Sequence, residues 1–239
     1  MTSWRYLDTG PARGAENMAM DEKLLADAVK AGAVPVLRFY SWSPPAVSLG
    51  RFQEEAASVN AAACRRHGFD IVRRITGGRA VLHRYELTYS VISPIDNRLF
   101  PNDVLGTYKV IAAGLLAGFI HLGVPAEMVS PSGDRADMVP RDPKGPSCFS
   151  SPSWYEILVQ GKKIAGSAQR RVAGAFLQHG SILLDYDPGL ESEVIPGGGR
   201  STAVTCIRQE LGRAVGLDEA KTAFLWGFSE ALNISILPE

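Results

Sequence analysis

The sequence is poor in histidine and cysteine and has no excess of either charge, and each shortage excludes a class of protein. Four histidines, scattered without metal-ligand spacing, and the absence of Cys-x-x-Cys and His-Glu-x-x-His argue against a zinc site. Twenty-five basic residues balance 25 acidic ones, so the chain lacks the basic field of a general nucleic-acid or membrane-surface binder. Three cysteines cannot all pair within one chain, so we expect reduced thiols in a cytoplasmic protein.

Long apolar runs are missing as well. The N-terminal segment has no apolar stretch of signal-peptide length, and no stretch approaches the roughly 20 apolar residues of a membrane helix. Hydrophobic residues make up 46% and charged residues 21% of 239 residues, which is ordinary for a globular chain with a sizeable core. We therefore predict a single domain over residues 1–239, with neither a membrane nor a nucleic acid as partner.

Hydrophobic periodicity predicts helices and strands that are mixed along the chain rather than strictly alternating. Because strand runs follow one another with helices set between them, we predict an α+β fold with a mixed or mainly antiparallel sheet flanked by helices. The expected helices are 15–31, 58–67, 103–122, 205–215 and 218–232, and Ser58 is a candidate N-cap. The expected strands are 36–42, 46–49, 70–74, 80–82, 86–92, 154–159, 163–171 and 176–184.

The periodicity is lost between residues 130 and 152, where five prolines and two glycines occur. A long loop without regular structure in a compact domain is usually functional or disordered. Cys148 lies in this loop among small and polar residues, which makes it the better candidate for a nucleophile. Cys64 and Cys206 lie in or near predicted helices and fit the role of small buried hydrophobes.

Two segments of small residues could admit a ligand. Gly77 and Gly78 follow a strand, and a glycine pair allows close approach to the backbone, although a tight β-turn is the favoured explanation for this pair alone. The strand segment 165–168, Ala-Gly-Ser-Ala, leaves space above a sheet. Either a ligand chain or a large side chain from a neighbouring strand would fill that space. Lys163, at the start of this segment, is a surface lysine by default.

Together, several motifs resemble the biotin/lipoate protein ligase superfamily. They are Arg73-Arg-Ile-Thr-Gly-Gly-Arg-Ala-Val-Leu-His83, Gly161-Lys-Lys-Ile-Ala-Gly-Ser-Ala-Gln169 and Gln178-His-Gly-Ser-Ile182. Asn17-Met-Ala-Met-Asp21 and Ser48-Leu-Gly-Arg-Phe-Gln53 also match, so the resemblance runs from about residue 4 to about residue 185. It implies the catalytic-domain fold shared by class II synthetases and biotin/lipoate ligases.

Within that superfamily, Ser147-Cys-Phe-Ser-Ser-Pro-Ser-Trp-Tyr-Glu156 is similar to the octanoyltransferases of the LipM type. The resemblance implies transfer of an octanoyl group from acyl carrier protein to a lipoyl-domain lysine, through a thioester on a cysteine. The family's nucleophile maps onto Cys148 and its site lysine onto Lys163. It implies no cofactor, because the acyl group arrives on the phosphopantetheine of the carrier.

The resemblance also implies partners and a binding pocket. The acceptor would be a lipoyl domain such as the glycine cleavage H protein or the E2 component of a 2-oxoacid dehydrogenase. A local cluster of arginines, at 65, 66, 73, 74, 79 and 84, could attract an acidic carrier protein, although each arginine alone is as readily structural. The substrate-binding residues would be Arg73, Gly77, Gly78, Arg79, Ala80, His83, Gly166, Ser167, Ala168, His179 and Gly180.

Three other functions compete with this one. An ATP-dependent lipoate or biotin ligase would share Lys163, but such ligases lack the loop cysteine as a rule. An amidotransferase that moves octanoyl between lipoyl domains would use a similar cysteine. A non-catalytic acyl- or carrier-binding module would need neither Cys148 nor Lys163, so the presence of both disfavours it.

Overall fold

A computed structural model describes residues 2–129, 155–199 and 203–238 and has a large mixed sheet at its centre. The order of strands across this sheet is β10 (Ala165–Val172), β11 (Ala175–Leu183), β6 (Glu86–Pro94), β2 (Val36–Trp42), β1 (Thr2–Ala12) and β12 (Ile234–Pro238). β10, β11, β6 and β2 pair antiparallel, whereas β1 pairs parallel with both β2 and β12. The predicted α+β fold with a mixed sheet is therefore confirmed.

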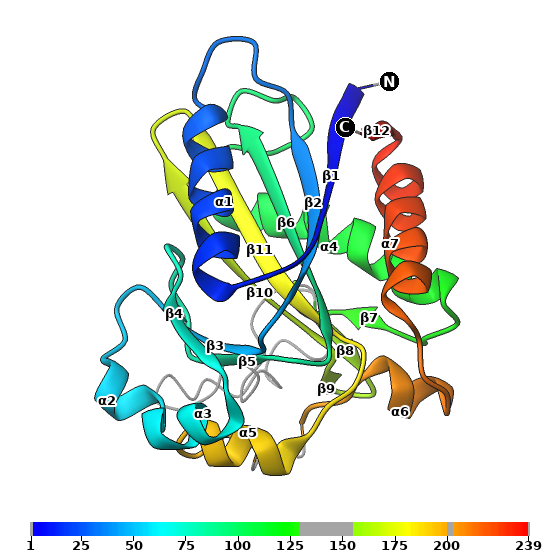
Figure 1. Ribbon diagram of the computed structural model, residues 1–239. Helices are drawn as coiled ribbons and strands as arrows, with labels where there is room; N and C mark the ends of the chain where they lie inside the picture. Colours follow the sequence, from blue (N-terminus) through cyan, green and yellow to red (C-terminus); the bar gives the residue numbers. More distant parts are fainter. Residues whose placement is uncertain (1, 130–154, 200–202, 239) are drawn as a thin grey trace.

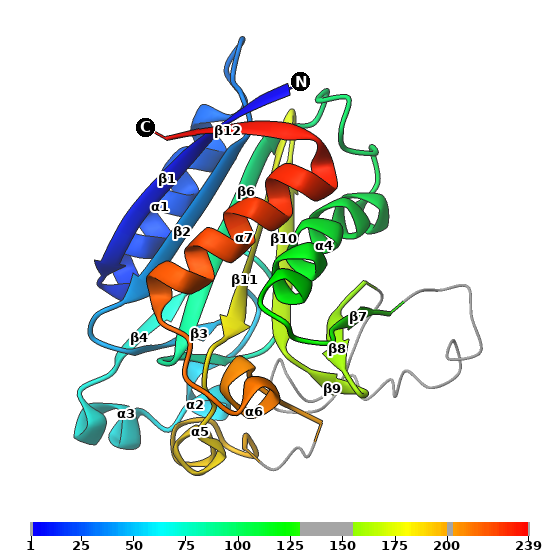
Figure 2. The ribbon, with the colours of Figure 1, turned by 90° about the vertical axis from the view of Figure 1, so that its right-hand side faces the viewer.

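Helices cover both faces of the sheet. α1 (Gly14–Asp27) lies on one face, in front of β6 and β11 in Figure 1. α4 (Val104–His121) and α7 (Leu217–Leu232) pack against each other on the opposite face, which is turned toward the viewer in Figure 2. The two ends of the chain lie side by side, because β12 pairs with β1.

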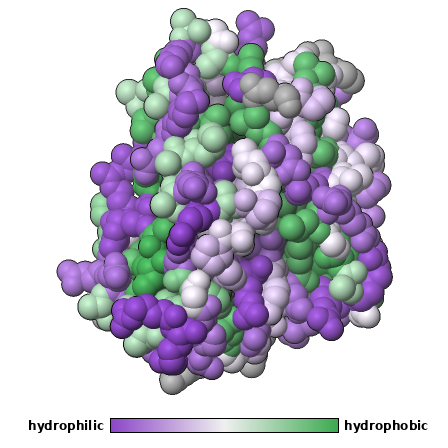
Figure 3. Space-filling model, in the orientation of Figure 1, coloured by the Kyte–Doolittle hydropathy of each residue, from purple (hydrophilic) through white to green (hydrophobic). Residues whose placement is uncertain are grey.

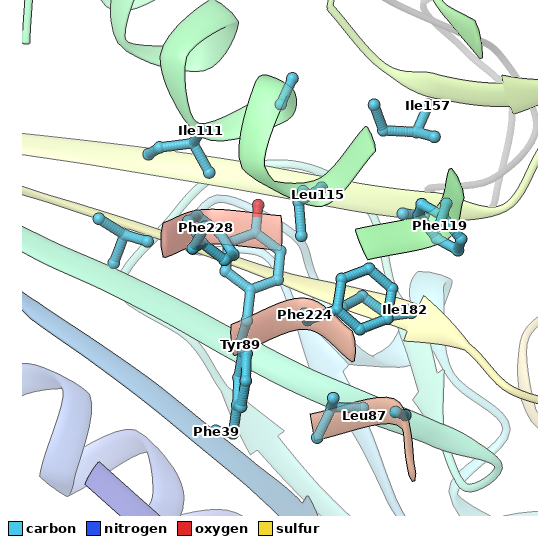
Figure 4. Packing of buried hydrophobic residues seen from close by; sticks show 14 of the residues in the cluster. Phe39, Leu87, Tyr89, Ile111, Leu115, Phe119, Ile157, Ile182, Phe224 and Phe228 are labelled. Carbon is cyan, nitrogen blue, oxygen red and sulfur yellow. The ribbon is translucent and has the colours of Figure 1, made fainter. Parts of the chain in front are cut away.

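The largest core cluster fills the space between the sheet and the α4–α7 pair. Figure 4 shows Tyr89 of β6 beside Phe224 and Phe228 of α7, with Leu115 and Phe119 of α4 on the other side. Among the described residues, α4 is the one helix long and apolar enough to cross a membrane by length and composition. It packs its buried face on α7 and the sheet, which is how a core helix behaves.

Two small sheets and four short helices lie at the lower end of the main sheet. β4 (Asp70–Arg73), β3 (Ala46–Leu49) and β5 (Val81–His83) form one small sheet, and β7 (Glu127–Met128), β8 (Ile157–Val159) and β9 (Lys162–Lys163) form the other. The short helices are α2 (Glu55–Ser58), α3 (Ala61–His67), α5 (Pro188–Val194) and α6 (Ile207–Leu211). The small sheet around β3 stands below the N-terminal end of α1 (Figure 1), and the functional pocket lies there.

Several predicted boundaries were wrong. The helix expected over 15–31 ends at Asp27, and the helix expected over 58–67 begins after Asn60, whose side chain accepts a hydrogen bond from Ala63 N and caps it in place of Ser58. The strand expected over 163–171 is divided at Ile164 into β9 and β10. β1, β7, β12 and α5 were not predicted at all. The loop expected over residues 130–152, which contains Cys148, lies outside the described residues.

Candidate active site

A pocket opens on the α1 side of the main sheet, near the N-terminal end of α1. The β3–β4–β5 sheet covers it there. Two neighbouring strands form its floor. Gly166 of β10 pairs with Ser181 of β11, and Ala168 of β10 pairs with His179 of β11. Tyr40, Trp42 and Thr88 close it on the side of β2 and β6. The full lining is Met18, Tyr40, Trp42, Ser48, Arg74, Val81, His83, Thr88, Gly166, Ser167, Ala168, His179, Gly180 and Ser181.

Six of the predicted substrate-binding residues are brought together in this pocket: His83, Gly166, Ser167, Ala168, His179 and Gly180. The small residues of β10 and β11 serve both faces of the sheet. On the α4 side, the Tyr89 hydroxyl lies 2.7 Å from Ser167 Oγ, and a Cβ at Gly180 would come within 2.8 Å of the Tyr89 ring. A large neighbouring side chain, one of the two alternatives left open by the sequence, therefore fills the α4 face, and the pocket lies on the other face.

Four predicted binding residues, Gly77, Gly78, Arg79 and Ala80, are not part of the pocket lining. Arg74 lines the pocket, and its guanidinium donates hydrogen bonds to the carbonyl oxygens of Gly77 (2.8 Å) and Arg79 (2.7 Å). Gly78 has a φ of 90°, and Ala80 is buried in a separate core cluster. The residues from Gly77 to Ala80 thus shape the pocket through Arg74.

Arg73, the predicted binding residue next to Arg74, points elsewhere. It donates hydrogen bonds to the carbonyl oxygens of Gly50 (3.0 Å) and Gln53 (2.6 Å) and fastens the turn after β3. This turn packs closely against the loop of residues 76–79, because a Cβ at Gly50 would lie 2.0 Å from the carbonyl oxygen of Gly78. The loop of residues 76–79 is therefore held in place from two sides.

A buried network around Asp21 of α1 lies beneath the pocket. Asp21 Oδ1 accepts hydrogen bonds from Arg38 Nη1 (2.7 Å) and Ser90 Oγ (2.8 Å), and its Oδ2 accepts one from the Tyr40 hydroxyl (3.1 Å) and lies 2.9 Å from His179 Nδ1. Burial alone raises the pKa of Asp21, but the hydrogen bonds from His179 and Ser90 and the charge of Arg38 outweigh burial and hold that pKa below its ordinary value.

His179 connects this network to the glycine loop. Its Nε2 lies 2.7 Å from Thr76 Oγ1, directly before Gly77. A carboxylate can only accept, so Nδ1 donates to Asp21 and Nε2 accepts from the Thr76 hydroxyl. Burial lowers the pKa of His179 and outweighs the opposing effect of the hydrogen bond and charge of Asp21, so the imidazole is neutral near pH 7.

His83 is held in a second chain of hydrogen bonds on the opposite wall. Its Nδ1 lies 2.8 Å from Glu86 Oε1, and its Nε2 lies 2.7 Å from Ser48 Oγ. The ring stacks on Trp42, with centroids 4.0 Å apart and planes inclined by 16°. Ser48 Oγ also accepts a hydrogen bond from Arg74. The Arg74 guanidinium therefore contacts both the hydrogen-bond chain of His83 and the loop of residues 76–79.

Lys163 is buried, not a surface lysine, and it forms an ion pair. Its Nζ lies 2.6 Å from Glu156 Oε1, and the two side chains are only 2% and 9% exposed. Lys163 ends the short strand β9, and Glu156 immediately precedes β8, so a tight hairpin through Gln160 and Gly161 brings them together. Both turn residues have positive φ.

Among the described cysteines, Cys64 and Cys206 are completely buried and unpaired. Burial raises the pKa of both thiols, which makes them poor nucleophiles. The small-hydrophobe interpretation of these two residues is thus supported. The role of Cys148 stays a prediction, because it lies in the segment 130–154.

A basic groove lies on the other side of the glycine loop. It has a volume of about 680 Å³, and Arg51, Arg73, Arg74 and Arg170 line it together with Leu25 and other apolar residues of α1. Two arginines of the predicted cluster belong to it, whereas Arg84 stacks on Tyr85 instead. Hydrophilic side chains cover most of the face shown in Figure 3, and hydrophobic ones form small patches between them.

Sequence reasoning missed five residues that organise the site: Asp21, Arg38, Arg74, Glu86 and Glu156. One signal was available for Arg38, because a charged residue within the apolar run 36–42 is buried only if it is paired. Asp21 and Glu156 stood at the ends of two quoted motifs without a role assigned to them. The partners of all five depend on strand register, which the sequence does not state.

Comparison with known proteins agrees with this architecture. Residues 13–229 match the family model of the lipoyl protein ligase A/B catalytic domain. Octanoyltransferase LipM of Geobacillus kaustophilus is 43% identical, over 98% of this chain and 88% of that protein. The same enzyme of Symbiobacterium thermophilum is 44% identical, over 99% of this chain and 89% of that protein.

Solved structures show the same fold at lower sequence identity. A crystal structure of lipoate-protein ligase A bound with ATP superposes with a TM-score of 0.80, at 26% identity, over 100% of this chain and 89% of that one. The chain is thus similar in fold to a ligase and more similar in sequence to transferases.

Proposed function

This chain belongs to the lipoyl protein ligase A/B catalytic domain family, and we propose that it is an octanoyltransferase of lipoate biosynthesis. The observation that carries the proposal is the near full-length identity of 43% and 44% to octanoyltransferases. The small-residue lining of the pocket supports it, because such a lining suits an unbranched acyl chain better than a bulky side chain.

The nucleophile we propose is Cys148. A free thiol with a pKa of about 8.5 is mostly protonated at neutral pH, and the thiolate is the reactive form. Cys64 and Cys206 are buried and have raised thiol pKa values, which leaves Cys148 as the candidate among the three. Its thiolate would attack the thioester carbonyl, and the carrier's pantetheine sulfur would leave and take up the proton that the thiol lost.

Lys163 is the second residue that we propose to be catalytic. A buried ammonium favours a neighbouring thiolate and stabilises the negative charge that develops on the thioester oxygen. The geometry supports this role, since Glu156 keeps the ammonium fixed at 2.6 Å. Thiol-for-thioester exchange needs no activation by ATP, so the proposed reaction uses no cofactor.

In the second half of the reaction, the ε-amine of a lipoyl-domain lysine would attack the acyl-enzyme. The new C–N bond would form as the C–S bond to Cys148 breaks, and the amine proton would pass to the departing thiolate. We propose acyl carrier protein as the donor, lipoyl-domain proteins as acceptors and the cytoplasm as the location. The arginines of the groove support an acidic protein partner.

The acyl chain would lie along the rows of β10 and β11. Gly166 and Ala168 would leave room for it, and His179 would mark the polar end of the pocket. The neutral state of His179 supports this arrangement, because a charged imidazole would lose more hydration free energy when apolar methylene groups cover it.

The experiment mixes the protein with octanoyl acyl carrier protein, without ATP, and measures intact mass. We expect an added octanoyl group that hydroxylamine removes, which is absent from Cys148→Ala. Cys64→Ala is the matched control, because its thiol is buried in a core cluster and the adduct should form normally. Transfer to an apo-lipoyl domain is then followed by the same method.

Three results would contradict the proposal in different ways. An adduct that appears only with octanoate and ATP would assign the chain to the ligases. An adduct that forms only with an octanoylated lipoyl domain as donor would identify an amidotransferase. Normal turnover by Cys148→Ala would remove the cysteine from the mechanism.

A further inference from the structure

We propose that the basic groove is the docking surface of the acyl carrier protein that donates the octanoyl group. This inference rests on the proposed function, because it states where the donor of that reaction binds. Docking precedes acyl transfer, so it can be measured apart from the residue that receives the acyl group.

The groove concentrates positive charge in a chain whose net charge is zero. Its lining contains four arginines, Arg51, Arg73, Arg74 and Arg170, and one acidic residue, Glu22. Within the described residues, none of Arg51, Arg73 and Arg170 forms an ion pair with a carboxylate. Like charges repel one another, so an anionic partner would stabilise this cluster and be attracted to it.

Backbone carbonyl groups hold two of these arginines in place. Arg73 Nη1 donates hydrogen bonds to the carbonyl oxygens of Gly50 (3.0 Å) and Gln53 (2.6 Å), and Arg170 Nη1 donates to that of Ile75 (3.3 Å). A guanidinium carries five N–H groups, so both side chains keep donors for the carboxylates of a partner. Because these side chains are already held, less conformational entropy is lost when the partner binds.

An exposed aromatic side chain stands next to this charge. Phe52 follows Arg51 in the turn after β3 and is 85% exposed, the largest fraction among the large hydrophobic side chains of the described residues. The Arg51 guanidinium lies 5.5 Å from the centroid of its ring. Aromatic residues and arginines carry much of the binding free energy at protein–protein interfaces. The pair therefore indicates a protein partner with acidic and apolar side chains rather than a small anion.

The position of the groove favours the donor protein over the acceptor protein. The groove adjoins the acyl pocket, because Arg74 lines both, whereas Lys163 lines neither. An acceptor lysine must reach the reacting atoms with its own side chain, so the acceptor domain has to dock directly beside them. A carrier protein presents the acyl group on a long flexible arm, so its folded body can dock at a distance from them.

The test measures the dissociation constant of unacylated holo-carrier protein by fluorescence anisotropy, so that no acyl group is transferred during the measurement. Three groove variants are compared with the unaltered protein: Arg51→Glu, Arg170→Glu and Phe52→Ala. At an ionic strength of about 0.15 M, we expect binding to weaken about tenfold for each charge reversal and roughly fivefold for Phe52→Ala. Added salt should weaken binding less in Arg51→Glu than in the unaltered protein, because one screened attraction is already missing.

The matched control is Arg65→Glu. Arg65 belongs to the same arginine-rich part of the sequence and is exposed on α3, but it does not line the groove. Its variant should bind the carrier within about twofold of the unaltered protein, because salt screens charges outside the contact. Thermal unfolding of each variant checks the fold. If a charge reversal does not fold, Phe52→Ala decides, because it removes a side chain that lies almost entirely in solvent.

Carrier binding that no groove variant weakens, or that Arg65→Glu weakens as strongly, overturns the inference. An equal loss of affinity for an apo-lipoyl domain also overturns it, because the groove would then serve acidic domains in general. Absence of an octanoyl adduct on the unaltered protein overturns the proposed function instead. The two failures are distinguished because binding reports the first and intact mass the second.

Discussion

The Asp21 network and the Lys163–Glu156 pair are both buried and ionic, yet they are built differently. Asp21 receives hydrogen bonds from Arg38, Ser90, Tyr40 and His179, which belong to three neighbouring strands of the main sheet. The Lys163–Glu156 pair is formed within a hairpin of the three-stranded β7–β8–β9 sheet, directly after the segment 130–154.

This difference separates a network that supports the fold from a pair that serves the chemistry. Many donors on rigid elements around one carboxylate fix α1 to the sheet, and α1 forms one end of the pocket. A close pair on a small hairpin contributes less to global packing, and it includes the lysine that we propose to be catalytic. Three variants test this distinction.

The largest effect on stability is expected from Asp21→Asn. The change leaves the Arg38 guanidinium buried without its carboxylate, and breaking such a pair costs about 3 to 5 kcal/mol. Denaturant unfolding should show this loss, accompanied by loss of the pocket. A cost below about 1 kcal/mol would show that the network is no more structural than a surface ion pair.

The next effect is a pH dependence carried by His179. Its pKa is lower in the folded protein than in the unfolded chain, so the unfolded chain binds more protons as pH falls below about 6.5. Stability is therefore present above that pH and declines on acidification, by at most about 2 kcal/mol between pH 7 and pH 5. His179→Asn should lack this part of the decline, and unfolding curves at the two pH values measure it. An equal decline in both proteins would assign the pH dependence to other groups.

The smallest effect on stability is expected when both members of the hairpin pair are replaced. Lys163→Met combined with Glu156→Gln removes both charges together, and replacing both members of a buried ion pair at similar volume is often neutral or stabilising, so no loss of stability is expected. Octanoyl transfer should nevertheless be lost. If the double variant unfolds while Asp21→Asn does not, the roles assigned to the two regions are reversed.

Much of the fold was predictable because the periodic segments carry their own signal. The helix at 104–121 and the strand at 86–94 were found nearly in full, since apolar residues recur at the spacing of each element. β1 was missed because its partners are β2 and the distant β12, and its mixed sequence is stable as a strand only between them. The same applies to β7, a two-residue strand defined by its pairing with β8.

The site was predictable in its location and less so in its contacts. The motifs led to His83, His179 and the small residues of β10, because these share one pocket. They pointed to Arg73 instead of Arg74. Because neighbouring residues of a strand face opposite sides, an error of one position changes which side chain faces the pocket. Lys163 was found, but its partner depends on the hairpin register.

Gly50 illustrates how such a structure affects the interpretation of variants. Any side chain at this position would collide with the carbonyl of Gly78, and the collision is with backbone, which cannot move aside as a flexible side chain can. A genetic screen for inactive proteins would therefore recover Gly50 together with the residues that contact the acyl chain. A map of functional importance drawn from such a screen would overestimate the binding surface by including the parts that hold its loop.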